Sequence, residues 1–290
     1  MHHYIKYLFS ALCLFLSIQG RMKADETSTS KHLSKEQVLA QVDVLKAVVD
    51  TKIWPTFNAP EYALEMHYYE EGPFKMHLAL SDQDSIPRME CSSPDITFQT
   101  IPDVKNYEEW YAMLLHECFH GFQYKKYPGF WNALIECNPQ GLVASDTLKA
   151  LKRNYVWYNE RLAQESGLLA KMYEASDIYE ARELFDQFYI IRNERIELVK
   201  ERLGWDLRLF YLLTETIEGS ARYIEYNLYR EQGLSDTEWM TNLDSDSYYY
   251  SSGLYMMLIM DKLGITYKED LFSNYYSLIE LLRDKLKNHQ

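Results

Sequence analysis

Basic residues are in the minority in this sequence, and their shortage excludes one large class of partners. The 290 residues include 30 Lys and Arg against 43 Asp and Glu, so the formal net charge is -13. A chain of this charge has no general attraction to phosphate backbones or to anionic membrane surfaces. We therefore expect no nucleic-acid partner.

The sequence also lacks an N-terminal apolar run long enough to act as a membrane anchor. Apolar residues fill positions 8–18, behind Lys6, and polar and charged residues follow from Gln19. A transmembrane helix needs about 20 apolar residues, so this layout predicts a signal peptide over residues 1–23 instead of an anchor. Residues 24–33 are polar and predict a disordered lead-in. We expect an exported protein, secreted or periplasmic, with no stable membrane anchor.

Cysteine is scarce, which leaves little room for disulfide bonds. The chain has 4 Cys, and removal of the leader, which contains Cys13, leaves Cys91, Cys118 and Cys137. An odd number in an oxidising compartment means that at least one thiol is unpaired. Cys118 is expected to face the core. The other two are either a disulfide pair or small unpaired core residues.

The N-terminal part of the chain carries the strand signals. Ser34-x-x-Gln37 predicts the start of an amphipathic helix that ends at about residue 50. Three later segments have the pattern of strands: residues 62–69, 74–80 and 96–101. We therefore expect a sheet-containing lobe over about residues 34–140.

Helix signals dominate the rest of the chain. A helix is predicted over residues 106–124, and another from Asp177 to near Gly204. Apolar residues recur at steps of three and four from position 207 to 228, which predicts one long helix. The C-terminal lobe, about residues 141–290, is expected to be entirely helical.

The most specific signal is H-E-x-x-H in the helix predicted over residues 106–124. His116 and His120 lie one helical turn apart, so both imidazoles project from one face and can bind one tetrahedral zinc. Glu117 points to the side of that pair, where it can take a proton from water as a general base. The plainer interpretation is a pair of solvated histidines on an ordinary helix.

A third protein ligand is needed, because a hydrolytic zinc normally has three and leaves the fourth position to water. No histidine follows His120 at the metzincin spacing, and the only later one, His289, lies in the terminal tail. A carboxylate is therefore expected. Glu215 and Glu218 lie three positions apart on the long helix, and Gly219 would let this helix approach the metal-binding helix closely.

These motifs resemble the gluzincin zinc peptidases, in particular aminopeptidase N-like and clostridial-collagenase-like enzymes. In that family the third ligand is the Glu of an E-G-x-x-x-[YF] helix, a pattern matched by Glu218, Gly219 and Tyr223. The resemblance therefore implies Glu218 and not Glu215 as the ligand. The separation between the two metal-binding motifs is far longer here than in aminopeptidase N.

Two more segments resemble the same family. Tyr250-x-x-Gly253 is similar to the Y-x-x-G helix start whose Tyr hydroxyl stabilises the oxyanion, although Tyr250 is equally compatible with a structural role. Glu90, after Met89, is weakly similar to the Glu that grips a substrate's amino terminus, and a surface Glu fits it better. Arg222 departs from the pattern, because thermolysin-like enzymes have at this position an Asp that supports a metal ligand.

The sequence as a whole predicts a zincin-like α+β fold over residues 34–290 and a secreted metallopeptidase that uses Zn2+ to cleave a peptide or protein substrate. Two other classes remain open: an inactive zincin-fold protein that binds peptides or glycans, and a zinc hydrolase of non-peptide substrates. The expected site consists of the metal ligands His116, His120 and Glu218, the general base Glu117 and the oxyanion-stabilising Tyr250.

Overall fold

The structure is a computed structural model, and several of the expected features fall outside the residues that it describes. The signal peptide, the lead-in and the strand over residues 96–101 are outside them, as are Glu90, Cys91 and Cys137. No helix among the described residues is long and apolar enough to cross a membrane. The described residues are 35–57, 64–69, 75–80, 107–130, 145–207, 211–235, 237–244, 248–275 and 277–288.

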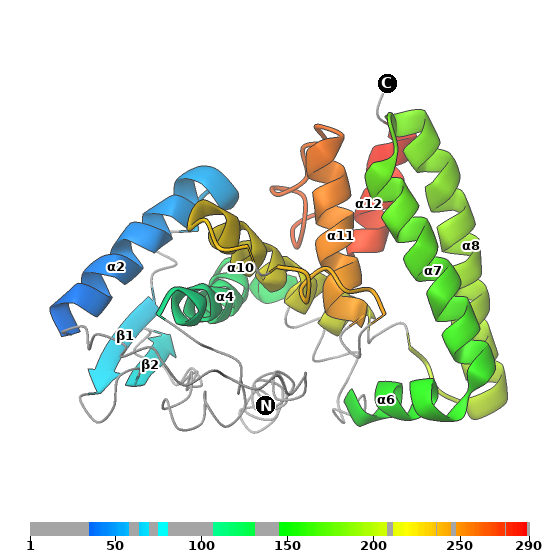
Figure 1. Ribbon diagram of the computed structural model, residues 1–290, viewed down its shortest axis with the longest axis horizontal. Helices are drawn as coiled ribbons and strands as arrows, with labels where there is room; N and C mark the ends of the chain where they lie inside the picture. The colour runs from blue at the N-terminus through cyan, green and yellow to red at the C-terminus, as the bar shows by residue number, and fades with distance from the viewer. Residues whose placement is uncertain are drawn as a thin grey trace. The chain divides into compact units, whose positions relative to one another are not determined.

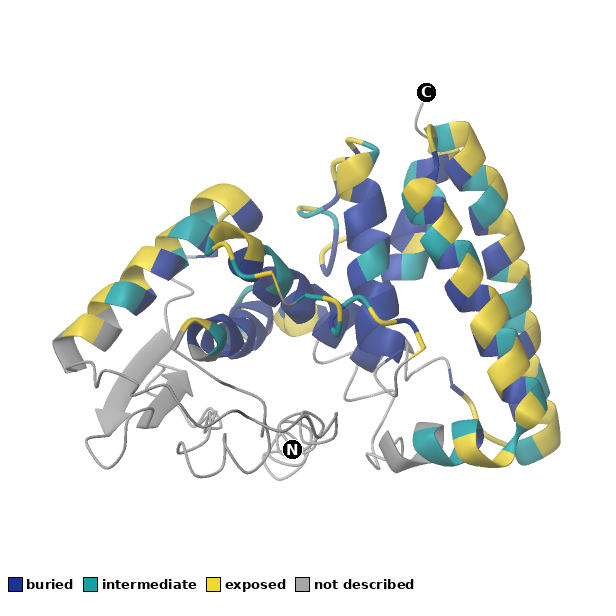
Figure 2. Ribbon diagram, viewed as in Figure 1, coloured by how far each residue is buried: buried dark blue, intermediate teal, exposed yellow. Residues whose placement is uncertain are grey.

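Contacts divide the chain into two compact units, the first of which is Met1–Pro128 with Ile224–Ser235. Its centre is α4, in which every residue from 111 to 123 is buried (Figure 2). Trp54 packs edge-on against Phe119 of α4, with ring centroids 4.8 Å apart. Its elements are α2 (Lys35–Val48), the π-helical η2 (Val49–Ile53), β1 (Leu64–Tyr69), β2 (Lys75–Leu80), α4 (Tyr107–Lys126) and the C-terminal part of α10 (Gly219–Glu231) (Figure 1).

The predicted α+β fold with an N-terminal sheet is wrong. The described residues are predominantly helical, and their named strands, β1 and β2, form only a two-stranded antiparallel hairpin that runs from the pair Leu64 and Leu80 to the pair Tyr69 and Lys75. Alternating apolar and polar residues were sufficient to predict two strands near these positions. An alternating pattern is a local signal, and it does not indicate how many strands pair side by side in the folded protein.

The second unit, Gly129–Tyr223 with Asp236–Gln290, is helical in its described residues apart from one isolated bridge. The predicted helix between Asp177 and Gly204 is confirmed: Asp177 caps it by accepting hydrogen bonds from two backbone N–H groups, and Gly204 ends it with a φ of 73°. Figure 1 shows α7 and α8 side by side. The helices of this unit are α6 (Ser145–Asn154), α7 (Val156–Glu174), α8 (Ile178–Leu203), η4 (Tyr211–Glu218), the start of α10, α11 (Tyr248–Lys262) and α12 (Leu278–Asn288).

The long helix predicted from residue 207 to 228 is not uniform. It begins as the π-helical η4, Tyr211–Glu218, and continues directly as the α-helical α10, Gly219–Glu231. A π-helix closes i→i+5 hydrogen bonds and has more residues per turn than an α-helix, and such segments often occur at functional sites. Side chains three positions apart therefore point in more divergent directions, so Glu215 and Glu218 do not share one face as they would on an α-helix.

Candidate metal centre

The two histidines of the H-E-x-x-H motif lie on the buried face of α4. His116 is fully buried and His120 is 2% exposed. One helical turn separates them, which brings their ring centroids to 4.9 Å with the planes nearly perpendicular. The interpretation of this motif as two solvated histidines is therefore wrong.

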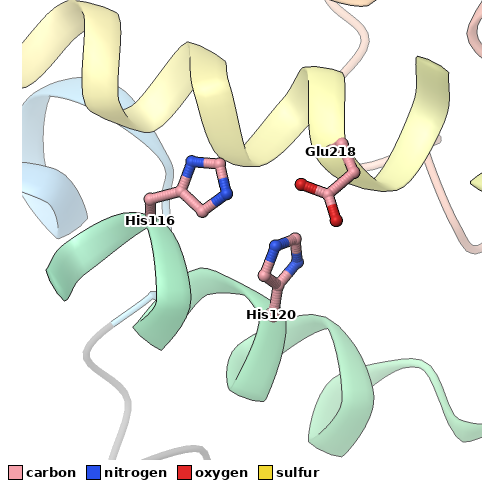
Figure 3. A group of neighbouring side chains, drawn as sticks. All are labelled: His116, His120 and Glu218. Atoms are coloured by element: carbon pink, nitrogen blue, oxygen red, sulfur yellow. The ribbon is translucent and has the colours of Figure 1, made fainter. Parts of the chain in front are cut away.

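Glu218 joins the two histidines in one group of candidate metal ligands. One ligand atom from each of His116, His120 and Glu218 lies within 4.8 Å of the other two, and all three residues are buried. Figure 3 shows the three side chains pointing toward one another, with both imidazoles on α4 and the carboxylate at the end of η4. Sequence reasoning thus selected the three residues that the structure brings together.

Each imidazole has a second polar neighbour at its Nδ1 atom. The Nδ1 atom of His116 lies 3.3 Å from Oε2 of Glu225, and Nδ1 of His120 lies 2.9 Å from Oε1 of Gln123. An amide oxygen can only accept, so the hydrogen bond with Gln123 favours the tautomer of His120 that carries its hydrogen on Nδ1 and presents the Nε2 lone pair. Glu225 lies within ion-pair distance of His116, where the same tautomer would direct its Nδ1 hydrogen toward the carboxylate. Neighbours of this kind fix the orientation of metal-binding histidines.

Glu225 is the site residue that sequence reasoning missed. It is 1% exposed and follows Glu218 by seven positions, which places the two residues two turns apart along the same helix. That spacing puts them on similar faces and was the available signal. The carboxylate beside the imidazole of the candidate ligand His116 therefore comes from Glu225, and not from position 222, where the chain has an arginine.

Glu215, the alternative third ligand, has other partners. Both of its carboxylate oxygens accept hydrogen bonds from Arg192, each at 2.7 Å, and one also accepts from Ser252. Two charge-assisted bonds of this geometry are strong. They commit Glu215 to an ion pair within the second unit, which distinguishes it from Glu218.

Gly219 does permit a close approach, but to a different helix from the one expected. A Cβ atom on Gly219 would lie 2.7 Å from the Cα atom of Gly253, and one on Gly253 would lie 2.1 Å from the backbone oxygen of Glu215. The backbones of η4, α10 and α11 are therefore in direct contact. The glycines of the E-G-x-x-x-Y and Y-x-x-G motifs pack against each other.

Tyr250 lies in the first turn of α11, which begins at Tyr248. Its ring faces the guanidinium carbon of Arg222 at 4.6 Å, and the same group lies 5.1 Å from the ring of Trp239. Arg222 follows Glu218 by one helical turn. This cation–π contact therefore holds Tyr250 beside the first turn of α10.

Glu117 and Cys118 follow His116 directly and differ in what they can do. Glu117 is 7% exposed, and each helical step of about 100° turns it away from the line that joins His116 and His120. Cys118 is a buried free thiol, and burial is the main cause that raises its pKa to about 12. A nucleophilic thiolate at Cys118 is therefore disfavoured, whereas Glu117 carries a carboxyl group of the kind that acts as a general base.

The donor set fits a single metal ion. Two imidazole nitrogens and one carboxylate oxygen at about 2.0–2.2 Å from a tetrahedral ion lie roughly 3.4 Å from one another. The donors observed here all lie within 4.8 Å of one another, so their types and their grouping fit such an ion.

Comparisons of the chain with protein-family models, with curated proteins and with solved structures give no match. The resemblance to the gluzincins consequently depends on the motifs of this chain alone.

Proposed function

We propose that this protein is a zinc-dependent hydrolase that cleaves peptide bonds. The observation that carries the proposal is the buried group of His116, His120 and Glu218. In this group the two imidazoles of the H-E-x-x-H motif lie close to a carboxylate that is distant in the sequence. Two nitrogen donors and one oxygen donor form a three-ligand set of the type that catalytic zinc prefers. The leader-like pattern over residues 1–23 supports action outside the cytoplasm.

In this proposal the ion supplies Lewis acidity and lowers the pKa of water at the site. Glu117 accepts the proton of the attacking water and returns it to the leaving amine, the role that a carboxylate adjacent to the first histidine can fill. Glu225 and Gln123 hold the two imidazoles in the tautomer that binds metal. Tyr250 donates its hydroxyl hydrogen to the developing oxyanion, with its ring held by Arg222.

The choice of a peptide substrate is supported by the resemblance of three motifs to gluzincin peptidases. The E-G-x-x-x-Y and Y-x-x-G motifs pack against each other through Gly219 and Gly253. This contact explains why both motifs contain a glycine, and it ties the element of Glu218 to the element of Tyr250. A hydrolase of another substrate class would use the same ligands and the same base.

The test compares wild type, Glu117→Gln and His120→Ala in metal content and in cleavage of a mixed peptide library. We expect about one zinc per chain in wild type and in Glu117→Gln, and loss of zinc in His120→Ala. Hydrolysis by Glu117→Gln should fall by about 10²- to 10⁴-fold, because an amide cannot accept the proton. Zinc retained by His120→Ala, or near-normal hydrolysis by Glu117→Gln, would reject the mechanism. Zinc binding without peptide cleavage by wild type would reject the substrate class.

A further inference from the structure

A network of buried charges occupies the second unit and shares two of its elements with Glu218 and Tyr250. Every member is at most 3% exposed. The members are Glu165 on α7, Arg192 and Arg195 on α8, Glu215 on η4, and Tyr248, Tyr249 and Ser252 on α11. We call these seven residues the ion-pair network.

Two arginines and two glutamates form the centre of the network. Arg192 donates to both oxygens of Glu215 at 2.7 Å and to Glu165 at 3.2 Å. Arg195 donates to both oxygens of Glu165, one of them at 2.8 Å. The charges balance, and each carboxylate is held by a guanidinium group in a fixed geometry. Because removal of one partner would strand a buried charge, the arrangement strongly specifies how α7, α8 and η4 pack.

The network fixes the position of the backbone that carries Glu218. Glu215 precedes Glu218 by three residues in the same π-helical element, and its carboxylate is bound by Arg192 and by Ser252. The intervening backbone is helical, so an anchor at Glu215 limits rotation and sliding of the element at Glu218. No network residue needs to touch Glu218 for this effect.

The network also fixes the start of α11. The hydroxyl of Tyr248 donates to Glu165 at 3.1 Å, and the hydroxyl of Tyr249 accepts from Arg195 at 3.1 Å. Successive residues of an α-helix turn by about 100°. With Tyr248 and Tyr249 directed into the network, the next residue, Tyr250, is turned away from it.

Direct backbone contact keeps the two anchored elements at one separation. The Cβ positions of Gly219 and Gly253 lie within 3 Å of backbone atoms of the facing element. Elements in such contact cannot move closer, and the hydrogen bond from Ser252 to Glu215 opposes their separation. Ser252 is the direct neighbour of Gly253, so the polar and steric restraints act at the same point.

We propose that the ion-pair network is a positioning device for the catalytic site, which sets Glu218 and Tyr250 from one buried core. The inference rests on the zinc-dependent function proposed above. The network residues are positioning residues, because they act through η4 and α11. Glu218 belongs to the metal ligands and Tyr250 to the oxyanion site.

The experiment removes the network's hold on η4 in two ways. Glu215→Gln replaces the charged acceptor of Arg192, and Ser252→Ala removes one hydroxyl while leaving the ion pairs intact. Tyr158→Phe is the matched control, because the Tyr158 hydroxyl contacts Tyr249 and Arg195 at the far side of the network. Each variant is measured by thermal unfolding without metal, by zinc affinity in chelator competition, and by the visible absorption bands of the Co2+-substituted protein.

We expect Glu215→Gln and Ser252→Ala to bind zinc roughly 10-fold more weakly or worse, the range seen when residues that support metal ligands are changed. Their Co2+ bands should shift, because the third ligand is displaced. Tyr158→Phe should unfold at a lower temperature but keep the zinc affinity and the Co2+ bands of wild type. If Glu215→Gln does not fold, the zinc affinity and the Co2+ bands of Ser252→Ala alone test the positioning role.

Normal zinc affinity and normal Co2+ bands in folded Ser252→Ala and Glu215→Gln would overturn the inference and leave the proposed function standing, provided that His120→Ala still loses zinc. Equal zinc loss in Tyr158→Phe would also overturn it, since the network would then act only through general stability. Absence of zinc binding in wild type would reject the proposed function itself, and the positioning role with it.

Discussion

Two buried polar clusters in this protein handle charge in opposite ways. In the ion-pair network, Arg192 and Arg195 supply a positive charge for each of the carboxylates Glu165 and Glu215. In the candidate metal centre, the buried carboxylate of Glu225 lies beside the imidazole of His116 and not beside an arginine. An imidazole can donate a lone pair to a metal ion. The first cluster is electrically complete without any ligand. We infer that the second is completed by a cation, so their stabilities should respond differently to metal.

The sharpest test of this comparison is the loss of one arginine from the ion-pair network. Arg192→Met strands the buried carboxylate of Glu215 and removes one of the two guanidinium partners of Glu165, so the free energy of unfolding should fall by about 3–5 kcal/mol. Urea unfolding of metal-free protein measures the change, and a similar loss should appear with zinc present. Lys200→Met serves as the control, because Lys200 is exposed on the same helix and its loss should cost less than about 0.5 kcal/mol. Equal effects of the two substitutions would show that the ion pairs do not hold the helices.

Steric contact between the elements that carry the two clusters gives the next largest effect. Gly253→Ala places a methyl group 2.1 Å from the backbone oxygen of Glu215, and such overpacking costs about 1–3 kcal/mol or more. Gly167→Ala, in the exposed part of α7 with nothing within 4 Å of its Cβ position, should instead stabilise the protein by about 0.5–1 kcal/mol. Thermal unfolding of the two variants beside wild type distinguishes them. A harmless Gly253→Ala would mean that α11 is free to move away from η4.

A substitution in the candidate metal centre should have the opposite pattern of effects from one in the ion-pair network: it should lower zinc affinity and leave the stability of the metal-free protein nearly unchanged. Glu225→Gln leaves an acceptor beside Nδ1 of His116 but removes the charge, and zinc affinity should fall by about 10- to 100-fold. Unfolding of the metal-free protein should change little, because no ion pair with an arginine is broken. Chelator competition measures the affinity, with Glu231→Gln as the control on the exposed part of the same helix, where Glu231 pairs with Lys52. Unchanged zinc affinity in Glu225→Gln would remove it from the site.

The sequence was sufficient to select the three candidate ligands, the two histidines from helix geometry and Glu218 from the resemblance of its motif to the gluzincins. His116 and His120 are one turn apart on a single helix, and Glu218 belongs to a short local motif. Glu225 was within reach of the same reasoning, two turns after Glu218. The partner of Gly219 was not, because a glycine signals close contact without naming the element that it contacts.

The ion-pair network and the fold class lay beyond sequence reasoning for a physical reason. Arg192 and Glu215 meet only when α8 packs against η4, and nothing in either segment marks the pairing. Charged residues are usually exposed, so the composition of the two segments gives no reason to expect a buried ion pair between them. The two strand patterns were local and were found, but the number of strands in a sheet is a tertiary property.

The smallest expected effect is an acid sensitivity that belongs to the ion-pair network. Burial opposes ionisation of Glu165, yet Arg195 and Arg192 together lower its pKa below the ordinary value. A carboxyl group whose pKa is lower in the folded state contributes stability above its unfolded pKa, about 4.3, and loses that contribution as the pH falls through the folded pKa. The free energy of unfolding of the metal-free protein should therefore decline below about pH 4.

Glu180 and Asp270 also have lowered pKa values, from hydrogen bonds with Ser176 and Lys285 respectively, but they lie near the surface, where salt screens charge. Urea unfolding between pH 6 and pH 2 (a window of roughly the carboxyl titration range), repeated in high salt and in a Glu180→Gln, Asp270→Asn double variant, separates the two sources. The decline that comes from Glu165 should persist in both. Its disappearance in the double variant would assign the acid sensitivity to the surface and would show that protonation of Glu165 is not what opens the network.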